Sequence, residues 1–270
     1  MTVENIASLF ARTLSDRGSR DLYKGEGAQL YRDFVRNDKA ETSEVKQAGT
    51  LLRSDAVVGE LASGEGRLLF SLPPTQIKKY VAIDSSPVLL GALVERASEM
   101  GLEADRVLAI QENLLTWDPE PETFDLLIFG AGTARLFDED QRQTIFSSAR
   151  KALKKNGLFY ASTSESLAGV DRLINLGQAN LRGRENVIFF YDTSIANDSA
   201  REIGFIVLPV GKPNASARIY RSTVLNLAAD TLAAELHSAD FSLVERIERE
   251  YKSATGMDER TTSFIVSVEE

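Results

Sequence analysis

The pattern of hydrophobic positions divides the chain into three regions. Before residue 53, apolar residues recur at the three- and four-residue spacing of amphipathic helices, over residues 3–14, 29–35 and 41–52. From residue 55, short apolar runs alternate with helical patterns. From residue 185, β-rich runs are separated by Asn, Asp, Gly and Pro. The chain therefore predicts helices first, then mixed α/β structure, then a β-rich segment.

The middle region predicts a parallel sheet. Five short apolar runs are its expected strands: residues 57–61, 80–83, 107–111, 124–129 and 157–162. Three segments between them carry a helical pattern: residues 66–72, 86–100 and 139–154, with Gly157 at the expected stop of the last helix. Strands joined by helical crossovers form a doubly wound parallel sheet, which binds ligands at the carboxyl ends of its strands.

The last region predicts an antiparallel insertion followed by a helix and a strand pair. The insertion has three β-rich runs, at residues 186–194, 202–210 and 217–227. A helical pattern follows at residues 230–241. Residues 242–248 and 261–270 are expected to pair as antiparallel strands at the edge of the main sheet, joined by the turn-like segment 253–260.

Composition narrows the classes of function. The 270 residues, 43% of them hydrophobic, suit one α/β domain with extra elements or two small domains. With no cysteine and one histidine, His237, the chain has no disulfides, no thiolate nucleophile and no multi-histidine metal site, and we expect no metal. A net charge of −9 argues against binding nucleic acid.

The N-terminus lacks a basic signal-peptide head, and no apolar run approaches the roughly 18 residues that cross a bilayer. We therefore expect a cytoplasmic protein without a membrane partner.

Residues 57–70, "VVGELASGEGRLLF", place an acid and glycines together at the end of a predicted strand. A phosphate-binding loop of the G-x-x-x-x-G-K-[ST] type is absent from the chain. A nicotinamide-binding G-x-G-x-x-G turn would need a third small residue where Leu69 stands. The carboxylate of Glu60 would also repel a pyrophosphate, whereas a ligand with a cationic end removes that objection.

The segment "ELASGEG" resembles the E/D-x-G-x-G-x-G motif of class I S-adenosylmethionine-dependent methyltransferases, with Ala62 in the first glycine position. Over about residues 55–165, "YVAID", "QENLLTW", "FDLLIFGAGT" and "ARKALKKNGLFYAS" follow in the family's order, and "LAAELHSADFSLVER" resembles its last helix and strand pair. The resemblance implies a Rossmann-like, doubly wound, seven-stranded sheet that is parallel with an antiparallel C-terminal strand. S-adenosyl-L-methionine is the implied cofactor.

The same resemblance implies one methyltransferase domain with four parts. Residues 1–52 form a helical lid, 53–166 the cofactor-binding core, 167–225 the β insertion and 226–270 the last helix and strand pair. The segment 29–45, "QLYRDFVRNDKAETSEV", resembles one common in bacterial small-molecule methyltransferases. A looser likeness is to natural-product methyltransferases, including those that act on daptide-type peptides.

Several residues are implied to bind the cofactor. Glu60 would order the loop and the ammonium end of the cofactor, or cap nearby amides; Asp84 would accept both ribose hydroxyls, or cap the following helix. Asn113 stands where the family often has Asp. Ala62 is expected to sit where positive φ is not needed. The full expected set is Tyr31, Glu60, Ala62, Gly64, Gly66, Arg67, Asp84, Ser85, Asn113, Leu114, Gly130 and Ala131.

Other residues are expected at the methyl acceptor. Transfer requires the acceptor lone pair roughly 3 Å from the methyl carbon and exclusion of water. Tyr31, Thr133 and Glu165 are the expected catalytic residues, each with a structural alternative. Trp117 would cover the adenine or pack in the core, and His237 would pack or lie on the surface. Phe190, Tyr191 and Tyr220 are expected to line the substrate pocket or to form the insertion's own core.

The leading hypothesis is an N-methyltransferase for an amine of a small molecule or modified peptide in bacterial secondary metabolism, because an amine needs no strong base. A carboxyl O-methyltransferase, with Arg182 and Arg184 near the acceptor, is the alternative. A non-catalytic methyltransferase-like binding subunit is another, and a nicotinamide oxidoreductase is third. We expect a small-molecule or peptide acceptor and allow for a homodimer.

Overall fold

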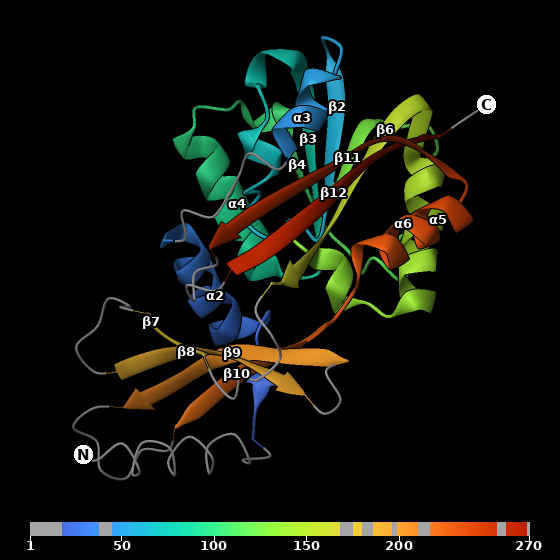
Figure 1. The fold of residues 1–270 in the computed structure, drawn as a ribbon. Helices are drawn as coiled ribbons and strands as arrows, with labels where there is room; N and C mark the ends of the chain where they lie inside the picture. The colour runs from blue at the N-terminus through green and yellow to red at the C-terminus, as the bar shows by residue number, and fades with distance from the viewer. Residues whose placement is uncertain are drawn as a thin grey trace. The chain divides into compact units, whose positions relative to one another are not determined.

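The computed structural model describes residues 18–37, 45–167, 175–179, 186–195, 199–209, 217–252 and 258–268 (Figure 1). The chain divides into two compact units. The smaller contains Met1–Lys39 and Gly169–Val224, and the larger contains Ala40–Ala168 and Leu225–Glu270. The helix expected over residues 3–14 lies outside the described residues.

The larger unit is built on a seven-stranded sheet in the order β11-β12-β6-β5-β2-β3-β4. Its strands are β2 (Ala56–Leu61), β3 (Ile77–Asp84), β4 (Val107–Gln111), β5 (Phe124–Phe129), β6 (Leu153–Ser166), β11 (Phe241–Lys252) and β12 (Asp258–Val268). The five strands from β2 to β6 are parallel, and β12 runs antiparallel to both β6 and β11. This arrangement confirms the expected doubly wound sheet with a reversed C-terminal strand.

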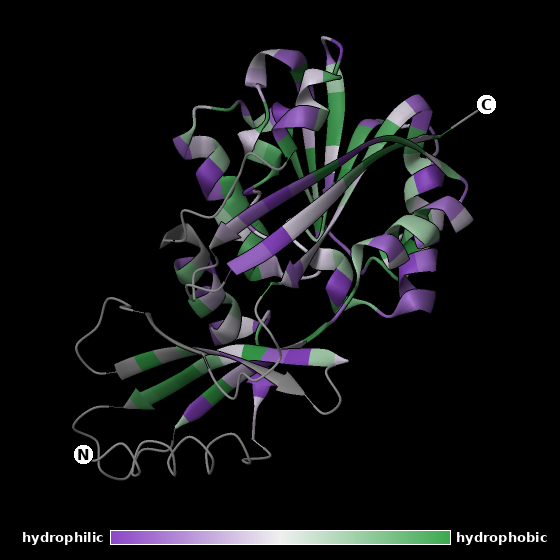
Figure 2. Ribbon diagram, viewed as in Figure 1, coloured by the Kyte–Doolittle hydropathy of each residue, from purple (hydrophilic) through white to green (hydrophobic). Residues whose placement is uncertain are grey.

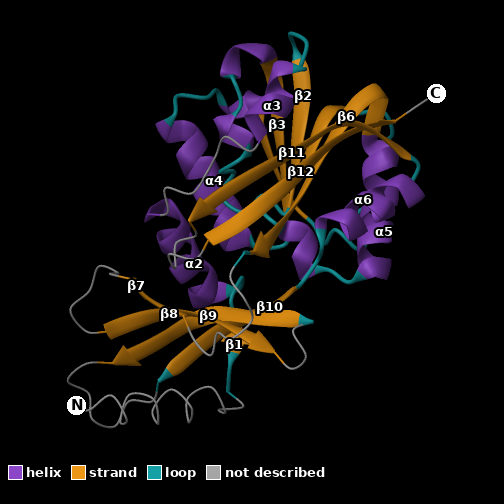
Figure 3. Ribbon diagram, viewed as in Figure 1, coloured by secondary structure: helices purple, strands orange, loops and turns teal. Residues whose placement is uncertain are grey.

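Helices cover both faces of this sheet (Figure 3). The helices α3 (Lys46–Thr50) and α4 (Pro87–Glu99) share one hydrophobic cluster with the strands. The helices α5 (Glu139–Ala152) and α6 (Ala229–Ser238) share the other. The central strands are hydrophobic along their length (Figure 2), as expected for parallel strands buried on both faces. No described helix has the length and apolar character needed to cross a membrane.

The helix predicted just after the glycine-containing loop is not present. Residues 66–72 form turns and a short 3-10 helix, Leu69–Ser71, instead of an α-helix. Gly64 and Gly66 both have positive φ, and Pro73 and Pro74 follow within a few residues, so too little chain remains for an α-helix. The further 3-10 helices of the larger unit are Pro74–Gln76, Ala104–Arg106 and Thr133–Leu136.

The end of α5 also differs from the prediction. Gly157 does not stop the helix, because α5 ends at Ala152 and β6 begins at the buried Leu153. Asn156 has φ +60°, and Gly157 follows it within β6, where the pairing to β5 is irregular. A Cβ at Gly157 would lie 2.8 Å from the carbonyl oxygen of Lys154, so this glycine is required by a bulge in the strand.

The smaller unit is a five-stranded sheet in the order β1-β10-β9-β8-β7 with one described helix, α2 (Gly25–Asn37). Its strands are β1 (Arg20–Asp21), β7 (Asn175–Ala179), β8 (Asn186–Ile195), β9 (Ala200–Pro209) and β10 (Arg218–Leu225). Three of them match the expected β-rich runs, and β1 and β7 are additional. Phe34 of α2 stacks on Phe190 at 4.6 Å between ring centroids and meets Phe205 edge-on, so the helix covers one face of the sheet.

Candidate functional site

Hydrogen bonds tie together the carboxyl ends of β2, β3 and β4. After β2, the Ser63 amide donates to the carbonyl oxygen of Ile83 at 3.1 Å, and the Gly64 amide donates to a carboxylate oxygen of Asp84 at 2.8 Å. After β4, the Glu112 amide donates to the Asp84 carbonyl oxygen at 3.0 Å. The expected cofactor-binding loops therefore meet at the carboxyl edge of the sheet.

Glu60 lies next to the end of β2 and is buried. Its Oε2 atom accepts a hydrogen bond from the Leu69 amide at 3.0 Å. This bond spans the whole glycine-containing loop between the two residues. This contact fits both expected roles of Glu60, the ordering of the loop and the capping of nearby amides by a strand-end carboxylate.

Positive φ recurs through this loop. Ala62 has φ +51°, Gly64 +55° and Gly66 +74°. The expectation that Ala62 avoids positive φ is wrong, since its backbone adopts the left-handed conformation that favours glycine. A Cβ at Gly66 would lie 2.8 Å from the ring of Phe70, so Gly66 is required by packing as well as by its backbone.

Asp84 ends β3 and is buried beside the same loop. One oxygen accepts from Gly64 and the other accepts from the Ser86 amide at 2.7 Å. Burial raises the pKa of Asp84 above its usual value, and hydrogen bonds from the Ser86, Gly64 and Ser85 amides oppose that rise. Ser86, not Asp84, is the N-cap residue of α4.

Two hydroxyl groups flank Asp84. The Oγ atoms of Ser63 and Ser86 are buried, and neither has a hydrogen-bond partner in the described part of the chain. Buried polar atoms are nearly always hydrogen-bonded in folded proteins. The loop ends around Asp84 therefore hold two buried hydroxyl groups that make no hydrogen bond to any described residue.

The other expected cofactor residues lie on neighbouring loops. Arg67 follows Gly66 and is half-buried, while Ser85 follows Asp84 and is exposed. Asn113, after β4, is exposed, and its side-chain oxygen accepts from the Leu115 amide at 3.1 Å. Leu114 is buried.

The loop after β5 starts at Gly130. A Cβ there would lie 2.3 Å from Cδ1 of the buried Leu68, which would have to shift. Ala131 and Gly132 have φ +53° and +67°, and the Thr133 amide donates to the Gly130 carbonyl oxygen at 3.0 Å. The loop therefore turns tightly at the carboxyl edge of the sheet and leads directly into the 3-10 helix that begins at Thr133.

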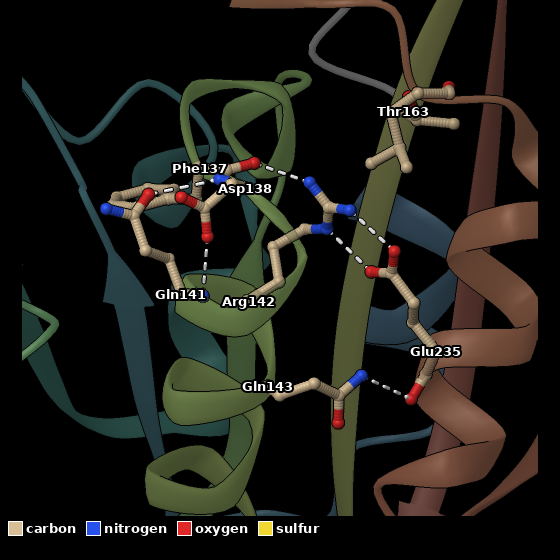
Figure 4. A network of polar contacts seen from close by, with 8 residues as sticks. Phe137, Asp138, Gln141, Arg142, Gln143, Thr163 and Glu235 are labelled. Atoms are coloured by element: carbon tan, nitrogen blue, oxygen red, sulfur yellow. Dashed lines mark hydrogen bonds and ion pairs between the residues drawn. The ribbon is translucent and has the colours of Figure 1, made fainter.

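A buried ion pair anchors the segment that follows this loop (Figure 4). Arg142 of α5 binds both carboxylate oxygens of Glu235 of α6, at 2.6 and 2.5 Å, and also donates to the Phe137 carbonyl oxygen. Asp138 and Gln141 form a capping box at the start of α5. Neither feature was among the sequence-based predictions, and the ion pair joins partners that are 93 residues apart.

The expected acceptor residues are distributed over both units. Thr133 and Glu165 lie in the larger unit, and Glu165 pairs in register with Arg260 of β12. Tyr31 lies on α2 in the smaller unit, where its ring meets Tyr23 edge-on at 5.1 Å.

The remaining aromatic residues pack in hydrophobic clusters, and the one histidine is at the surface. Trp117 packs in the core near Phe124. Phe190, Tyr191 and Tyr220 are buried in clusters of the smaller unit itself. His237 is exposed on α6.

The strand order, the reversed strand β12 and the acid-and-glycine loop after β2 define the class of fold as that of the class I methyltransferases. Residues 58–157 match the family model described as "Methyltransferase domain". This match confirms the resemblance drawn from the sequence and identifies this segment as a methyltransferase domain.

Solved structures agree on the fold. The CcbJ methyltransferase from Streptomyces caelestis has a TM-score of 0.68 at 18% identity, covering 90% of this chain and 96% of that one. An S-adenosylmethionine-dependent methyltransferase from Clostridium acetobutylicum scores 0.65 at 14% identity, covering 91% and 98%. A sugar N-methyltransferase from a Streptoalloteichus species scores 0.61 at 16% identity, covering 90% and 92%. A search among curated protein sequences found no match.

Proposed function

We propose that the chain is an S-adenosyl-L-methionine-dependent methyltransferase that N-methylates an amine of a small molecule or modified peptide. The methyltransferase domain and the likeness to a sugar N-methyltransferase support this proposal. The observation that carries it is the carboxylate of Asp84, held by backbone amides beside the positive-φ loop that follows Glu60.

The residues of the site fit this cofactor. A carboxylate has about four acceptor positions, so Asp84 can accept ribose hydroxyls in addition to its backbone donors. The buried hydroxyls of Ser63 and Ser86 add polar groups that lack partners among the described residues. Glu60 supplies negative charge at the end of β2, which suits a ligand with a cationic end and opposes a pyrophosphate.

When bound, S-adenosyl-L-methionine supplies a methyl group on a sulfonium, ready for in-line displacement. Asp84 would orient the ribose, and Glu60 would attract the ammonium end. Asn113 would accept from the adenine amino group, with the Leu114 amide beside the ring. Close backbone approach would come from Ala62, Gly64, Gly66, Ser85, Gly130 and Ala131, the last two next to the methionine end of the cofactor. Arg67 would bind the carboxylate of that end, and Tyr31 would close over the sulfonium or the carboxylate.

An amine acceptor requires few further catalytic groups from the protein. A neutral amine needs positioning and exclusion of water more than a strong base. Thr133, at the turn after β5, would hold the acceptor. Glu165, which was expected to attract an ammonium group there, is paired in register with Arg260 of β12 instead. Arg182 and Arg184, which would favour a carboxylate acceptor, lie outside the described residues.

The test uses cofactor labelled on its methyl group and panels of amines and carboxylic acids. Label in N-methyl products supports the proposal, and label only in methyl esters contradicts the amine assignment. Calorimetry with S-adenosylhomocysteine separates binding from catalysis, since tight binding without transfer to any panel member would favour a binding subunit. Titration with NADH should show no binding; saturable NADH binding would contradict the cofactor assignment.

A further inference from the structure

The strand β6 continues past the end of its parallel neighbour. Its last pair with β5 joins Phe129 to Ala161, whereas its pairs with β12 continue to Ser166 and Glu259. At about 3.3 Å per residue, the five residues 162–166 extend the strand by about 16 Å. Together with the paired parts of β12 and β11, residues 258–263 and 247–252, they form a three-stranded antiparallel extension at the carboxyl edge of the sheet.

One face of this extension adjoins the loop after β5. Residues directly opposite in antiparallel strands share a face, as do alternate residues along a strand. Tyr160, Ser162 and Ser164 therefore share a face. The Ser162 hydroxyl oxygen accepts from the Gly132 amide at 3.4 Å, and a Cβ at Gly130 would lie 3.1 Å from the Tyr160 ring. This is the loop whose backbone we place beside the methionine end of the cofactor.

The same face carries a buried carboxylate with two hydroxyl donors. Glu259 is 7% exposed, and its Oε2 accepts from the Ser164 hydroxyl at 2.8 Å and from the Tyr251 hydroxyl at 2.9 Å. The two hydroxyl oxygens are 3.2 Å apart. Burial, followed by the charge of Glu259, raises the pKa of Tyr251 to about 12. The phenol therefore keeps its proton at neutral pH and acts as a hydrogen-bond donor to the carboxylate.

The opposite face of the extension has different chemistry. Arg260 donates to Glu250 at 2.8 Å, and Glu165 is opposite Arg260 in register. The pKa of Arg260 is raised, first by its hydrogen bond to Glu250, and the charge of Glu165 contributes. The carboxylate of Glu165 thus acts on an arginine of its own sheet, on the face away from Ser162 and the loop after β5.

We propose that Glu259, Tyr251 and Ser164 form the recognition site for the amine of the methyl acceptor and for a hydroxyl group next to that amine. The acceptor class is then a hydroxylated amine, such as an amino sugar or amino alcohol. This inference rests on the proposed methyltransferase function. A buried carboxylate attracts an ammonium more strongly than an exposed one, because less water screens it. The two hydroxyls complement neighbouring hydroxyls of the acceptor.

The experiment compares glucosamine with glucose as probes, using calorimetry on the full chain saturated with S-adenosylhomocysteine. We expect glucosamine to bind about tenfold more tightly than glucose. Glu259→Gln should abolish that preference while leaving affinity for S-adenosylhomocysteine unchanged. Glu250→Gln is the matched control, because it removes the same charge from the other face, where the Glu250 side chain is 63% exposed. It should retain the preference.

A second variant tests the inference even if Glu259→Gln does not fold. Tyr251→Phe keeps the ring and removes one hydroxyl, and we expect it to weaken binding of glucosamine and of glucose about three- to fivefold while the preference for glucosamine remains. The inference is overturned if the wild-type chain shows no preference for glucosamine. It is equally overturned if Glu259→Gln keeps the preference for glucosamine, or if Glu250→Gln loses that preference to the same degree. Failure of the wild-type chain to bind S-adenosylhomocysteine would instead overturn the proposed function itself.

Discussion

Replacing Asp84 with Asn probes the proposed cofactor site with almost no change in side-chain size. The two carboxylate oxygens accept from Gly64 at 2.8 Å and from Ser86 at 2.7 Å. An amide has one oxygen, so its NH2 group must face one of these two donors. A buried donor that loses its acceptor costs about 1–3 kcal/mol. That cost lowers the stability of the free and the bound protein alike. Loss of the charge-assisted bonds to the two ribose hydroxyls should weaken S-adenosylhomocysteine binding about 100-fold, or about 2.8 kcal/mol.

The same carboxylate gives the binding a pH dependence of known sign. Burial raises the pKa of Asp84 above its usual value. Binding that needs the ionised form should therefore weaken as pH falls through this raised pKa, at a higher pH than for an ordinary aspartate. In the free protein the sign is opposite. The native state favours the protonated form, so Asp84 aids folding most below its unfolded pKa, and that contribution is lost as pH rises through its folded pKa.

Calorimetry with S-adenosylhomocysteine across this pH range measures both effects, alongside chemical unfolding of the free protein. Asp118→Asn is a suitable control, since the Asp118 side chain is 86% exposed and pairs only at the surface with Lys151. It should bind as the wild type does. If Asp84→Asn is folded and binds within about twofold of the wild type, the assignment of Asp84 to the ribose is refuted.

Three further substitutions test the structure around the site by chemical unfolding. Ala62→Gly should raise the free energy of unfolding by about 0.5–1 kcal/mol, because it relieves the strain of φ +51°; a lower midpoint would contradict this. Arg142→Ala should lower the free energy of unfolding by about 3–5 kcal/mol, because it leaves Glu235 buried and unpaired. Replacing both residues with Met should recover most of this loss. If the single and the double variant lose equal amounts, the ion pair does not account for the effect. Gly130→Ala should lower the free energy of unfolding by about 1–3 kcal/mol, because its Cβ would lie 2.3 Å from a buried leucine methyl group. Gly91→Ala, on the open surface of α4, should raise it instead. Similar effects at the two sites would contradict the packing argument.

The parallel core could be predicted from the sequence because its strands are continuous apolar runs. Residues 107–111 and 124–129 match β4 and β5 residue for residue. The strand β5 shows this signal because both of its faces are covered, whereas β4, at the edge of the sheet, is only half-buried. The α-helix predicted over residues 66–72 is absent for a reason that hydrophobicity does not reveal. Its apolar residues fit helical spacing, but the positive φ of the preceding loop, which decides the local structure, leaves no trace in a hydrophobic pattern.

Two buried polar contacts of the larger unit join distant segments of the chain. The partners Arg142 and Glu235 are 93 residues apart, and Ser164 and Glu259 are 95 apart. No periodicity links such positions, since they meet only after the crossover helices and the reversed strand are in place. The individual residue types were visible in the sequence, but their partners were not.

The choice between two acids near the acceptor shows why register matters for function. Glu165 and Ser164 are neighbours on β6 and therefore point to opposite faces. The pairing of Ser166 with Glu259 puts Glu259 on the face of Ser164, and the pairing of Glu165 with Arg260 puts Glu165 on the other. A shift of one residue in this pairing would exchange the two faces. In the proposed acceptor site, the acid that shares a face with Ser164 is thus set by how the C-terminal strands pair with β6, and not by the presence of an acid at the end of that strand.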